Sequence, residues 1–302
     1  MRIVSNLSFL TWPIAFFAVV LGSTTIQAQE NKSRPAVPGI QVSASPTMLE
    51  IPVSRFKMGG NPHHDEKAKT AESENRLLSV YRRDMSPKHN VIFEHKFEMS
   101  ATEVTQEQWT AVMGSNPSYH QDCGPTCPVE RVSWFDAISF ANQLSAKNGL
   151  EICYVMSGKE VSWPKGYDCK GYRLPTEAEW EAAARSPIEK TAEDRGPRYV
   201  SQFAWMDRNS NDTTHPVATR KADSMGLYDM RGNVWEWTWD RYGRYNGGKN
   251  VGPKGAKKGK RRVYRGGSAF NGFDENSRKY RAHWLPDGRD MNIGFRLARS
   301  ID

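Results

Sequence analysis

Long apolar runs are scarce in this chain of 302 residues. An apolar stretch from Phe9 to Leu21 follows Arg2 and leads through small or polar residues to Ala28. It is shorter than the roughly 20 residues that a membrane-spanning helix needs, and no cysteine follows closely enough for a lipid anchor. We interpret residues 1–28 as a signal peptide cleaved after Ala28, and a buried N-terminal helix is the alternative. The mature chain is therefore expected in the periplasm or outside the cell, without a membrane span.

The chain also lacks a proline- or serine-rich linker in its middle, and it has no evident internal repeat. Residues 29–48 are polar and contain prolines, which is typical of a disordered leader. The remaining residues, 49–302, are therefore predicted to form a single domain.

Cysteine is sparse, with four residues in the whole chain. Export exposes them to an oxidising compartment, where two disulfides are the expected arrangement. Four cysteines allow three pairings, and proximity favours Cys123–Cys127 across a Gly-Pro turn and Cys153–Cys169. Zinc is the competing interpretation, but no histidine pair stands at ligand spacing near these cysteines.

Positive charge exceeds negative charge, and the formal net charge is +8. Much of the excess lies in the segment Lys254–Arg262. This segment is either a solvated surface loop or a patch for an anionic partner, such as a glycan, a lipid headgroup or an acidic protein. An exported chain is not expected to meet nucleic acid.

Three capping boxes mark predicted helix starts, each with a Ser or Thr followed three residues later by a side chain that can bond back. The pairs are Thr105 with Gln108, Ser133 with Asp136, and Thr176 with Glu179. Strands are predicted at Ile51–Gly60, Asn90–Met99 and Asn292–Arg299. Short elements between long glycine-bearing loops indicate an α+β domain with little regular secondary structure.

The segment Gly226–Asp240 is the most distinctive part of the sequence. Its three tryptophans alternate with Glu236 and Thr238, which is the period of a strand with one buried face. Asn233 and Glu236 stand at the head of that strand, and both carry the oxygen ligands that a hard cation such as calcium prefers.

Five sequence blocks stand in an order that resembles the formylglycine-generating-enzyme family, also called sulfatase-modifying factors, from about residue 50 to the C-terminus. The blocks are Glu103–Trp109, Pro128–Trp134, Tyr172–Trp180, Gly226–Asp240, and Arg265–Ser268 followed by Gly294–Ala298. The resemblance implies a single α+β domain with few regular elements, related to the C-type-lectin fold. It also implies a calcium site to which Asn233 and Glu236 contribute, with nearby backbone carbonyls. The alternative is that Glu236 pairs with a buried arginine.

The family's oxidases convert a sulfatase cysteine to formylglycine with copper and dioxygen. Their two copper cysteines follow a Gly-Gly-Ser motif, and here Asn271 and Asn276 occupy those positions. An amide cannot replace a thiolate as a ligand of copper(I), so we expect neither copper nor the copper-dependent reaction. A second branch of the family holds iron with histidines, and this chain lacks its His-x-x-x-His spacing.

The family's pocket, by resemblance, is lined here by five side chains: Ser268, Asn271, Asn276, Arg278 and Arg281. Arginines in a pocket can hold a carboxylate or sulfate in a bidentate fork. The alternative is that both arginines form structural ion pairs.

Two functional hypotheses follow. The first is a calcium-supported binding or accessory module that holds an exported protein, a peptide or a glycan. The second is an enzyme with altered chemistry, because one exported family member matures the pyoverdine siderophore and also departs from the copper site. Asp274 or Glu275 would then supply acid–base chemistry, and their burial in the pocket would favour the enzyme. A true formylglycine-generating oxidase remains only if the argument against copper fails.

Overall fold

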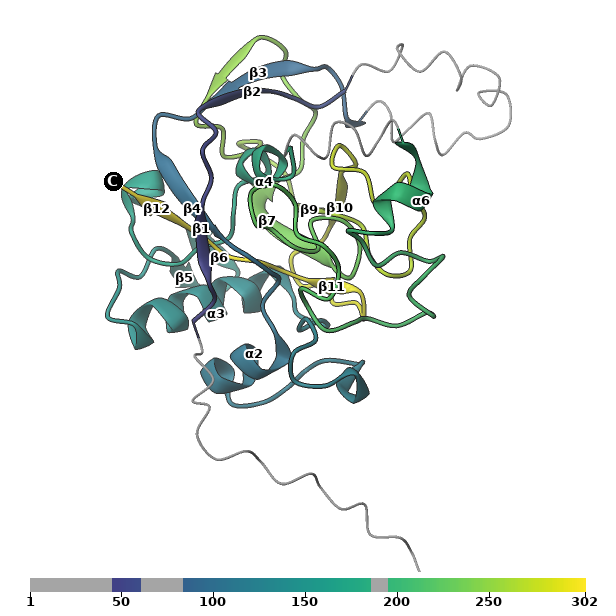
Figure 1. Cartoon of the computed structure of the whole chain (residues 1–302). Helices are drawn as coiled ribbons and strands as arrows, with labels where there is room; N and C mark the ends of the chain where they lie inside the picture. The colour runs from purple at the N-terminus through teal and green to yellow at the C-terminus, as the bar shows by residue number, and fades with distance from the viewer. Residues whose placement is uncertain (1–44, 61–83, 186–194) are drawn as a thin grey trace, which may run out of the picture. The chain divides into compact units, whose positions relative to one another are not determined.

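Three helices begin at the predicted capping boxes in the computed structural model, which describes residues 45–60, 84–185 and 195–302 (Figure 1). In each box the Ser or Thr side chain accepts a hydrogen bond from the backbone N–H three residues on, and the reciprocal bond is also present. The helices are α2 (Gln106–Met113), α3 (Trp134–Lys147) and α4 (Glu177–Ala183). A fourth, α6, spans Pro197–Val200, and the 3-10 turns η2 and η3 span Gln121–Cys123 and Gly166–Asp168.

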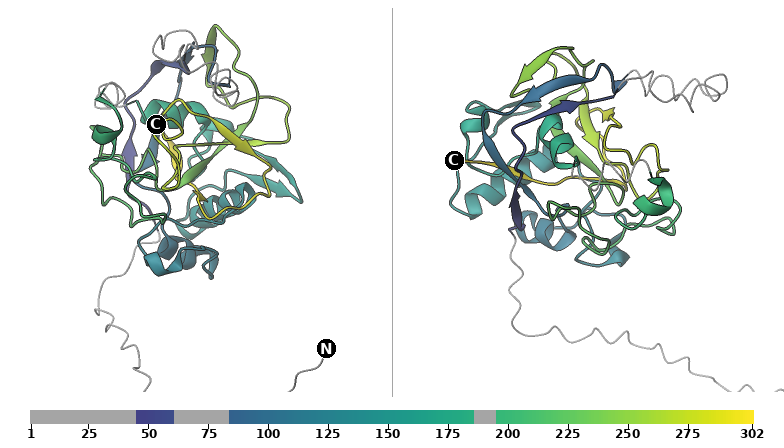
Figure 2. Two further views of the ribbon diagram at one scale, coloured as in Figure 1. Left: turned by 90° about the vertical axis from the view of Figure 1, so that its right-hand side faces the viewer. Right: turned by 45° about the horizontal axis from the view of Figure 1, so that its top comes forward.

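The first and last described strands lie in one antiparallel sheet of order β1-β4-β12. These strands are β1 (Met48–Glu50), β4 (Lys96–Ser100) and β12 (Ala298–Ile301). Figure 2 shows from two further sides that the C-terminal strand runs beside the N-terminal ones. The two ends of the described domain are therefore held together by backbone hydrogen bonds.

A second sheet has the order β2-β3-β8. It contains β2 (Arg55–Met58), β3 (His89–Ile92) and β8 (Lys249–Val251). The hairpin β5 (Val155–Ser157) and β6 (Glu160–Ser162) stands apart from it. All these elements belong to one unit, Val42–Asp302.

Three predicted strands were wrong in extent. Only Arg55–Met58, which is β2, is a strand within the predicted Ile51–Gly60, and two other predicted strands are each divided in two. The predicted strand Asn90–Met99 is divided into β3 and β4 by a bend at Phe93–His95, and Asn292–Arg299 is divided between β11 and β12. In both cases the two halves pair in different sheets, so the chain must turn between them. The alternating apolar pattern did not predict the turn between β11 and β12. Ile293, Phe295 and Leu297 are all buried, as they would be in one unbroken strand.

The tryptophan-rich segment forms the central strand of a third sheet, of order β10-β9-β7-β11. Its strands are β7 (Trp235–Arg241), β9 (Arg262–Arg265), β10 (Ala282–Trp284) and β11 (Ile293–Gly294), and β11 is parallel to β7. Trp237 is fully buried and donates its indole N–H to the carbonyl of Val132, just before α3. Trp134 of α3 donates in return to the carbonyl of Thr238. These two bonds fix helix α3 against the sheet.

Helix α4 is buried on every side, although three of its seven residues are glutamates. Glu179 is bound at both oxygens by Arg173, at 2.7 Å each. Glu181 pairs with Arg265 of β9 at 2.8 Å. Burying carboxylates is tolerable only because each has a cationic partner. The pair Glu181–Arg265 therefore holds the helix against β9.

The predicted α+β domain with little regular secondary structure is confirmed, and both predicted disulfides, Cys123–Cys127 and Cys153–Cys169, are formed. None of the helices in the described ranges has the length and hydropathy needed to cross a membrane. The predicted signal peptide lies outside the described residues, as does nearly all of the predicted leader 29–48, whose last residue, Met48, begins β1. The signal peptide, the cleavage after Ala28 and the exported location remain predictions.

Replacing Cys153 and Cys169 by serine is expected to lower the free energy of unfolding by about 3 kcal/mol, because their bond closes a long loop in the unfolded chain. The same replacement of Cys123 and Cys127 should cost about 2 kcal/mol, since only four positions separate them. Denaturant unfolding of both double variants and the wild type measures this. Equal losses would show that loop length does not govern the contribution of these bonds.

Candidate functional site

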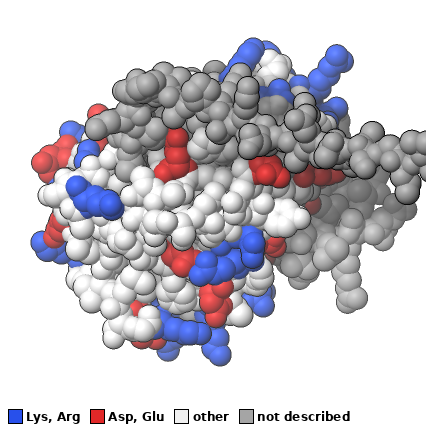
Figure 3. Space-filling view, turned by 90° about the horizontal axis from the view of Figure 1, so that it is seen from below, with Lys and Arg blue, Asp and Glu red and all other residues white. Residues whose placement is uncertain are grey.

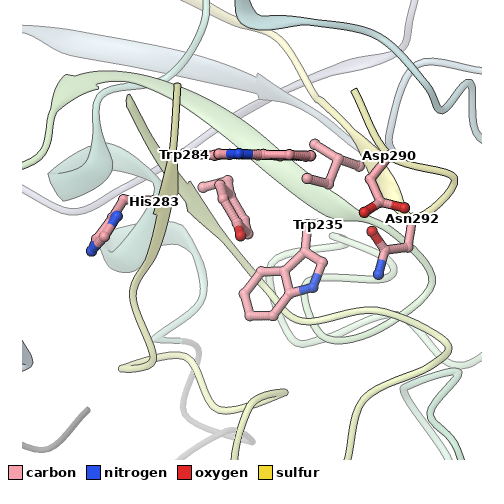
Figure 4. A pocket seen from close by; sticks show the side chains of 7 residues that line it. Trp235, His283, Trp284, Asp290 and Asn292 are labelled. Carbon is pink, nitrogen blue, oxygen red and sulfur yellow. The ribbon is translucent and has the colours of Figure 1, made fainter. Parts of the chain in front are cut away.

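A cavity of about 310 Å³ opens at one end of the sheet β10-β9-β7-β11 (Figure 4). Four strands or the loops beside them contribute to its wall. The lining residues are Trp235, Tyr264, His283, Trp284, Asp290, Asn292 and Ile293. In Figure 4 the indoles of Trp284 and Trp235 lie on opposite sides of the space, and Asp290 and Asn292 lie side by side at one end. Aromatic walls with a few convergent polar groups are the usual composition of a small-ligand site.

The aromatic walls are held rigidly. The rings of Trp235 and Tyr264 meet edge to face, with centroids 5.1 Å apart and an interplanar angle of 84°. Trp284 is 37% exposed, and the backbone of Gly288 packs against its indole, since a Cβ there would lie 2.6 Å from the Trp284 Cδ2. The exposed ring is therefore fixed from behind, and its other face is free for a ligand.

The polar end of the cavity joins two of the predicted pocket residues. Asn292 donates its side-chain N–H to the Ser268 hydroxyl at 3.4 Å, and that hydroxyl donates to the Asn271 Oδ1 at 2.5 Å. Burial, and the nearby charge of Arg261, lower the pKa of His283, so its imidazole is neutral at pH 7. Asp290 is the one acidic side chain among the lining residues, which include no lysine or arginine.

Asn276 is placed differently. Its side chain is fully buried and donates to the carbonyls of Asn271 and Gly272, at 2.7 and 2.8 Å. The amide therefore shapes the loop after the Gly-Gly-Ser motif. With amides at positions 271 and 276, and with all four cysteines in disulfides, the residues do not fit a thiolate-bound copper(I) ion.

The predicted arginines are also not among the lining residues. Both Arg278 and Arg281 are buried. Arg281 is an ion-pair partner of Glu177, with a hydrogen bond of 2.7 Å, and its guanidinium lies 3.8 Å from the ring centre of Tyr245. The backbone carbonyl of Arg278 accepts a bond from Arg265. Arg281 therefore forms a structural ion pair, which was the alternative to ligand binding considered in the sequence analysis.

The two candidate acid–base residues likewise lie outside the cavity wall. Asp274 is exposed and Glu275 is half-buried, and neither belongs to the lining set. The buried carboxylate that would have favoured acid–base catalysis at these positions is therefore not found.

The head of β7 is stabilised by an ion pair. Glu236 accepts bonds from Arg296 at both oxygens, at 2.7 and 2.8 Å, and from the Trp180 indole N–H at 2.6 Å. Asn233 bonds through its oxygen and its nitrogen to the backbone of His215. Calcium binding by these two side chains remains a prediction, and it would require both sets of bonds to open.

Two other carboxyl groups near this pair have oxygens without a partner, and neither residue was predicted as a site residue. Both oxygens of Glu103 and the Oδ1 of Asp229 are buried without a partner. Burial raises the pKa of Glu103 well above its usual range, with a further contribution from Asp229. Burial likewise raises the pKa of Asp229 to about 6. These two groups have the chemistry that a buried cation needs, although within the described residues no cluster of three Asp, Glu, His or Cys side chains gathers at metal-binding distance.

The basic segment Lys254–Arg262 is only partly a surface feature. Lys257, Lys258 and Lys260 are exposed, whereas Arg262 is buried with its guanidinium 3.6 Å from the ring centre of Trp134. Elsewhere, the face seen from below shows Lys and Arg interspersed with Asp and Glu (Figure 3). An anionic partner for this segment remains a prediction.

The lining residues Tyr264, Trp284, Asp290 and Asn292 escaped the sequence prediction. The only sequence signal was a tryptophan just before the polar turn Pro286–Asp290. Their convergence depends on the pairing of β10 with β9 and of β11 with β7, which no single segment reveals.

Comparisons with known proteins agree with the fold described above. The family model of the sulfatase-modifying factor enzyme 1-like domain matches residues 34–301. The chain is 31% identical to the chaperone protein LppX of Paenibacillus barcinonensis over 237 residues, which cover 68% of this chain and 80% of the relative. It is 25% identical to the formylglycine-generating enzyme of Bos taurus, over 90% of this chain and 79% of that enzyme. The structure superposes on Treponema denticola variable protein 1 with a TM-score of 0.69 and 31% identity, covering 84% of this chain and 95% of that one.

The buried acids Glu103 and Asp229 are expected to make stability depend on pH. Their folded-state pKa values are raised, so their contribution to stability is complete below the unfolded pKa of about 4 and is lost as the pH rises through the folded value, about 6 for Asp229. In chelator, the melting temperature should fall between pH 5 and pH 7.

Asp229→Asn should flatten this decline, whereas Asp274→Asn, which neutralises an exposed carboxylate, should leave it unchanged. Thermal melts of the three proteins at a series of pH values measure the effect. A decline of the same size in Asp229→Asn would assign the pH dependence to other groups.

Proposed function

We propose that this chain, which belongs to the sulfatase-modifying factor family, is an exported binding or accessory module that holds its ligand in the aromatic cavity and carries out no copper-dependent oxidation. One observation carries the proposal. Where the family's oxidases have a pair of copper cysteines, this chain has two asparagines bonded into the loop beside an open aromatic cavity.

The thiol chemistry of this chain supports the absence of oxidase activity. Copper(I) binds to soft thiolate ligands, and the four cysteines of the sequence are all consumed by disulfides. Asn276 is held by two hydrogen bonds to backbone carbonyls, so its amide is committed to the fold. The side-chain oxygen of Asn271 accepts a hydrogen bond from the Ser268 hydroxyl. This bond links Asn271 to the polar end of the cavity.

The cavity itself has the features of a binding site. Its walls come from rings that are fixed by their neighbours, so little conformational entropy is lost when a ligand binds. The acid–base candidates Asp274 and Glu275 stay outside it. Binding without chemistry is the function that these residues support best, with an exported protein, peptide or glycan as the ligand.

Calcium is part of the proposal as a support of the fold. Both oxygens of Glu103 and the Oδ1 of Asp229 have no partner, whereas the Asp229 Oδ2 accepts the Ala218 N–H at 2.8 Å. Two buried carboxyl groups near one another must be either protonated or neutralised by a cation. Backbone carbonyls and water would complete the shell of such an ion. In this position calcium would stabilise the segment that precedes β7.

Calcium is expected to raise the melting temperature of chelator-treated wild-type protein at pH 7. It should have little effect on the Glu103→Gln, Asp229→Asn double variant, because the ionised oxygens are gone. Calorimetric titration with calcium chloride gives the affinity directly, and Asp274→Asn serves as the control. Equal calcium binding by wild type and double variant would place the ion elsewhere, with Asn233 and Glu236 as the next candidates.

The oxidase question is tested by incubating the disulfide-bonded chain with copper, dioxygen, a reductant and a cysteine-containing sulfatase-type peptide. We expect no aldehyde on the peptide by mass spectrometry, since no thiolate can hold copper. The formylglycine-generating enzyme of Bos taurus, run in parallel, shows that the assay works. Formation of aldehyde by this chain at a comparable rate would refute the proposal.

A further inference from the structure

We propose that the aromatic cavity binds a cationic side chain, the ammonium of a lysine or the guanidinium of an arginine, presented by a partner polypeptide. The inference rests on the proposed function and specifies the ligand class of the same site. Three observations carry it: the arrangement of the rings, the lack of an ion-pair partner for Asp290 among the described residues, and the apolar surface around the cavity mouth.

Three aromatic rings line the open cavity from different sides. Trp235 and Tyr264 stand nearly perpendicular, at 84°, and Trp284 lies on the opposite side of the cavity from Trp235 (Figure 4). The face of an aromatic ring carries negative electrostatic potential and attracts a cation within about 6 Å of its centre. Rings on several sides of a space can all contact one compact cation, whereas the flat face of a sugar needs one open ring.

Asp290 supplies the counter-charge. Its backbone carbonyl accepts bonds from the N–H groups of Arg131 and Ile293, at 2.9 and 3.1 Å, so its position is fixed. Among the described residues its carboxylate forms no ion pair and accepts only the Met291 N–H at 2.7 Å. The adjacent Arg289 is paired with Asp136 instead. A fixed carboxylate without a cation, at the end of an aromatic cavity, is complementary to a positively charged group.

The size of the cavity and its rim indicate a side chain on a polypeptide. About 310 Å³ is near the lower limit for small-ligand pockets, and it suits one long side chain. Leu285 and Met291 are 45% and 37% exposed, and they are the immediate neighbours of Trp284 and Asp290 in the sequence. They provide apolar surface on which the rest of a bound peptide can rest.

The test is calorimetric or fluorescence titration of the full mature chain, with its disulfides intact, using the peptide Ac-Gly-Gly-Lys-Gly-Gly-NH2 and its arginine analogue. The same peptide with Nε-acetyl-lysine keeps the length and removes the charge. We expect the acetylated peptide to bind at least tenfold more weakly than the lysine peptide. Added salt should weaken the binding of the two charged peptides. Equal affinities for the charged and acetylated peptides would overturn the inference.

Two variants locate the binding. Trp284→Ala and Asp290→Asn should each weaken binding of the lysine peptide by about tenfold, because one removes a ring and the other the counter-charge. Asp287→Asn, in the same loop but outside the lining set, is the matched control and should bind like wild type. Circular dichroism and melting temperature establish that each variant is folded. Unchanged affinity in both Trp284→Ala and Asp290→Asn would show that the cation binds elsewhere and overturn the inference.

A parallel panel of neutral mono- and disaccharides separates this inference from the proposed function. Saccharide binding that Trp284→Ala abolishes, without a preference for cationic peptides, would leave the proposed binding function intact and reject the cationic ligand. Retention of every binding activity by Trp284→Ala would reject the cavity as the binding site, and with it both proposals.

Discussion

The buried ion-pair network around helix α4 is the interaction on which the rest of the domain depends. Glu177 and Glu181 lie one turn apart on this short helix, and both bind the buried Arg265. Glu177 also binds Arg281, and Glu179 binds the buried Arg173. The neighbouring arginines favour the ionised form of these carboxyl groups. Burial alone would raise the pKa of Glu179, but Arg173 lowers it to about 2. Removing one member would leave an unpaired buried charge, which costs about 3–5 kcal/mol.

The network determines where the cavity forms. Arg265 links α4 to β9, and Arg281, immediately before β10, is linked to the same helix through Glu177. The strands that carry Tyr264 and Trp284 are thereby positioned from behind. Trp180 adds a bond from the same helix to Glu236 of β7. The cavity is thus built on rigid strands, and the buried amide of Asn276 holds the loop beside it through two backbone carbonyls.

How far the sequence could predict this structure depends on the range of each interaction. The capping boxes and the two disulfides involve residues close in sequence, and these were predicted correctly. The division of Asn90–Met99 and Asn292–Arg299 into pairs of strands depends on which sheet each half joins, and hydrophobic pattern does not report that. Resemblance to the family identified the domain. The assignment of Asn271 and Asn276 to the copper positions remains a prediction.

The site was predicted only in part, for the same reason. Ser268 and Asn271 adjoin the cavity through Asn292, because they belong to the recognisable Gly-Gly-Ser block. Arg281 turned out to serve the α4 network, since its partner Glu177 is 104 residues away. Glu103 and Asp229 could not be paired from sequence either, because acidic residues near apolar blocks are common and only the fold brings these two together.

The central claim is that this domain keeps the family scaffold and has lost the family's copper chemistry. The most direct test is the metal content of the mature protein, purified without chelator from the periplasm or the culture medium. Mass spectrometry of the metals should find calcium and no stoichiometric copper or iron. One equivalent of copper or iron per chain would contradict the account, because it would require a redox metal site that Asn271, Asn276 and the disulfide-bonded cysteines do not provide.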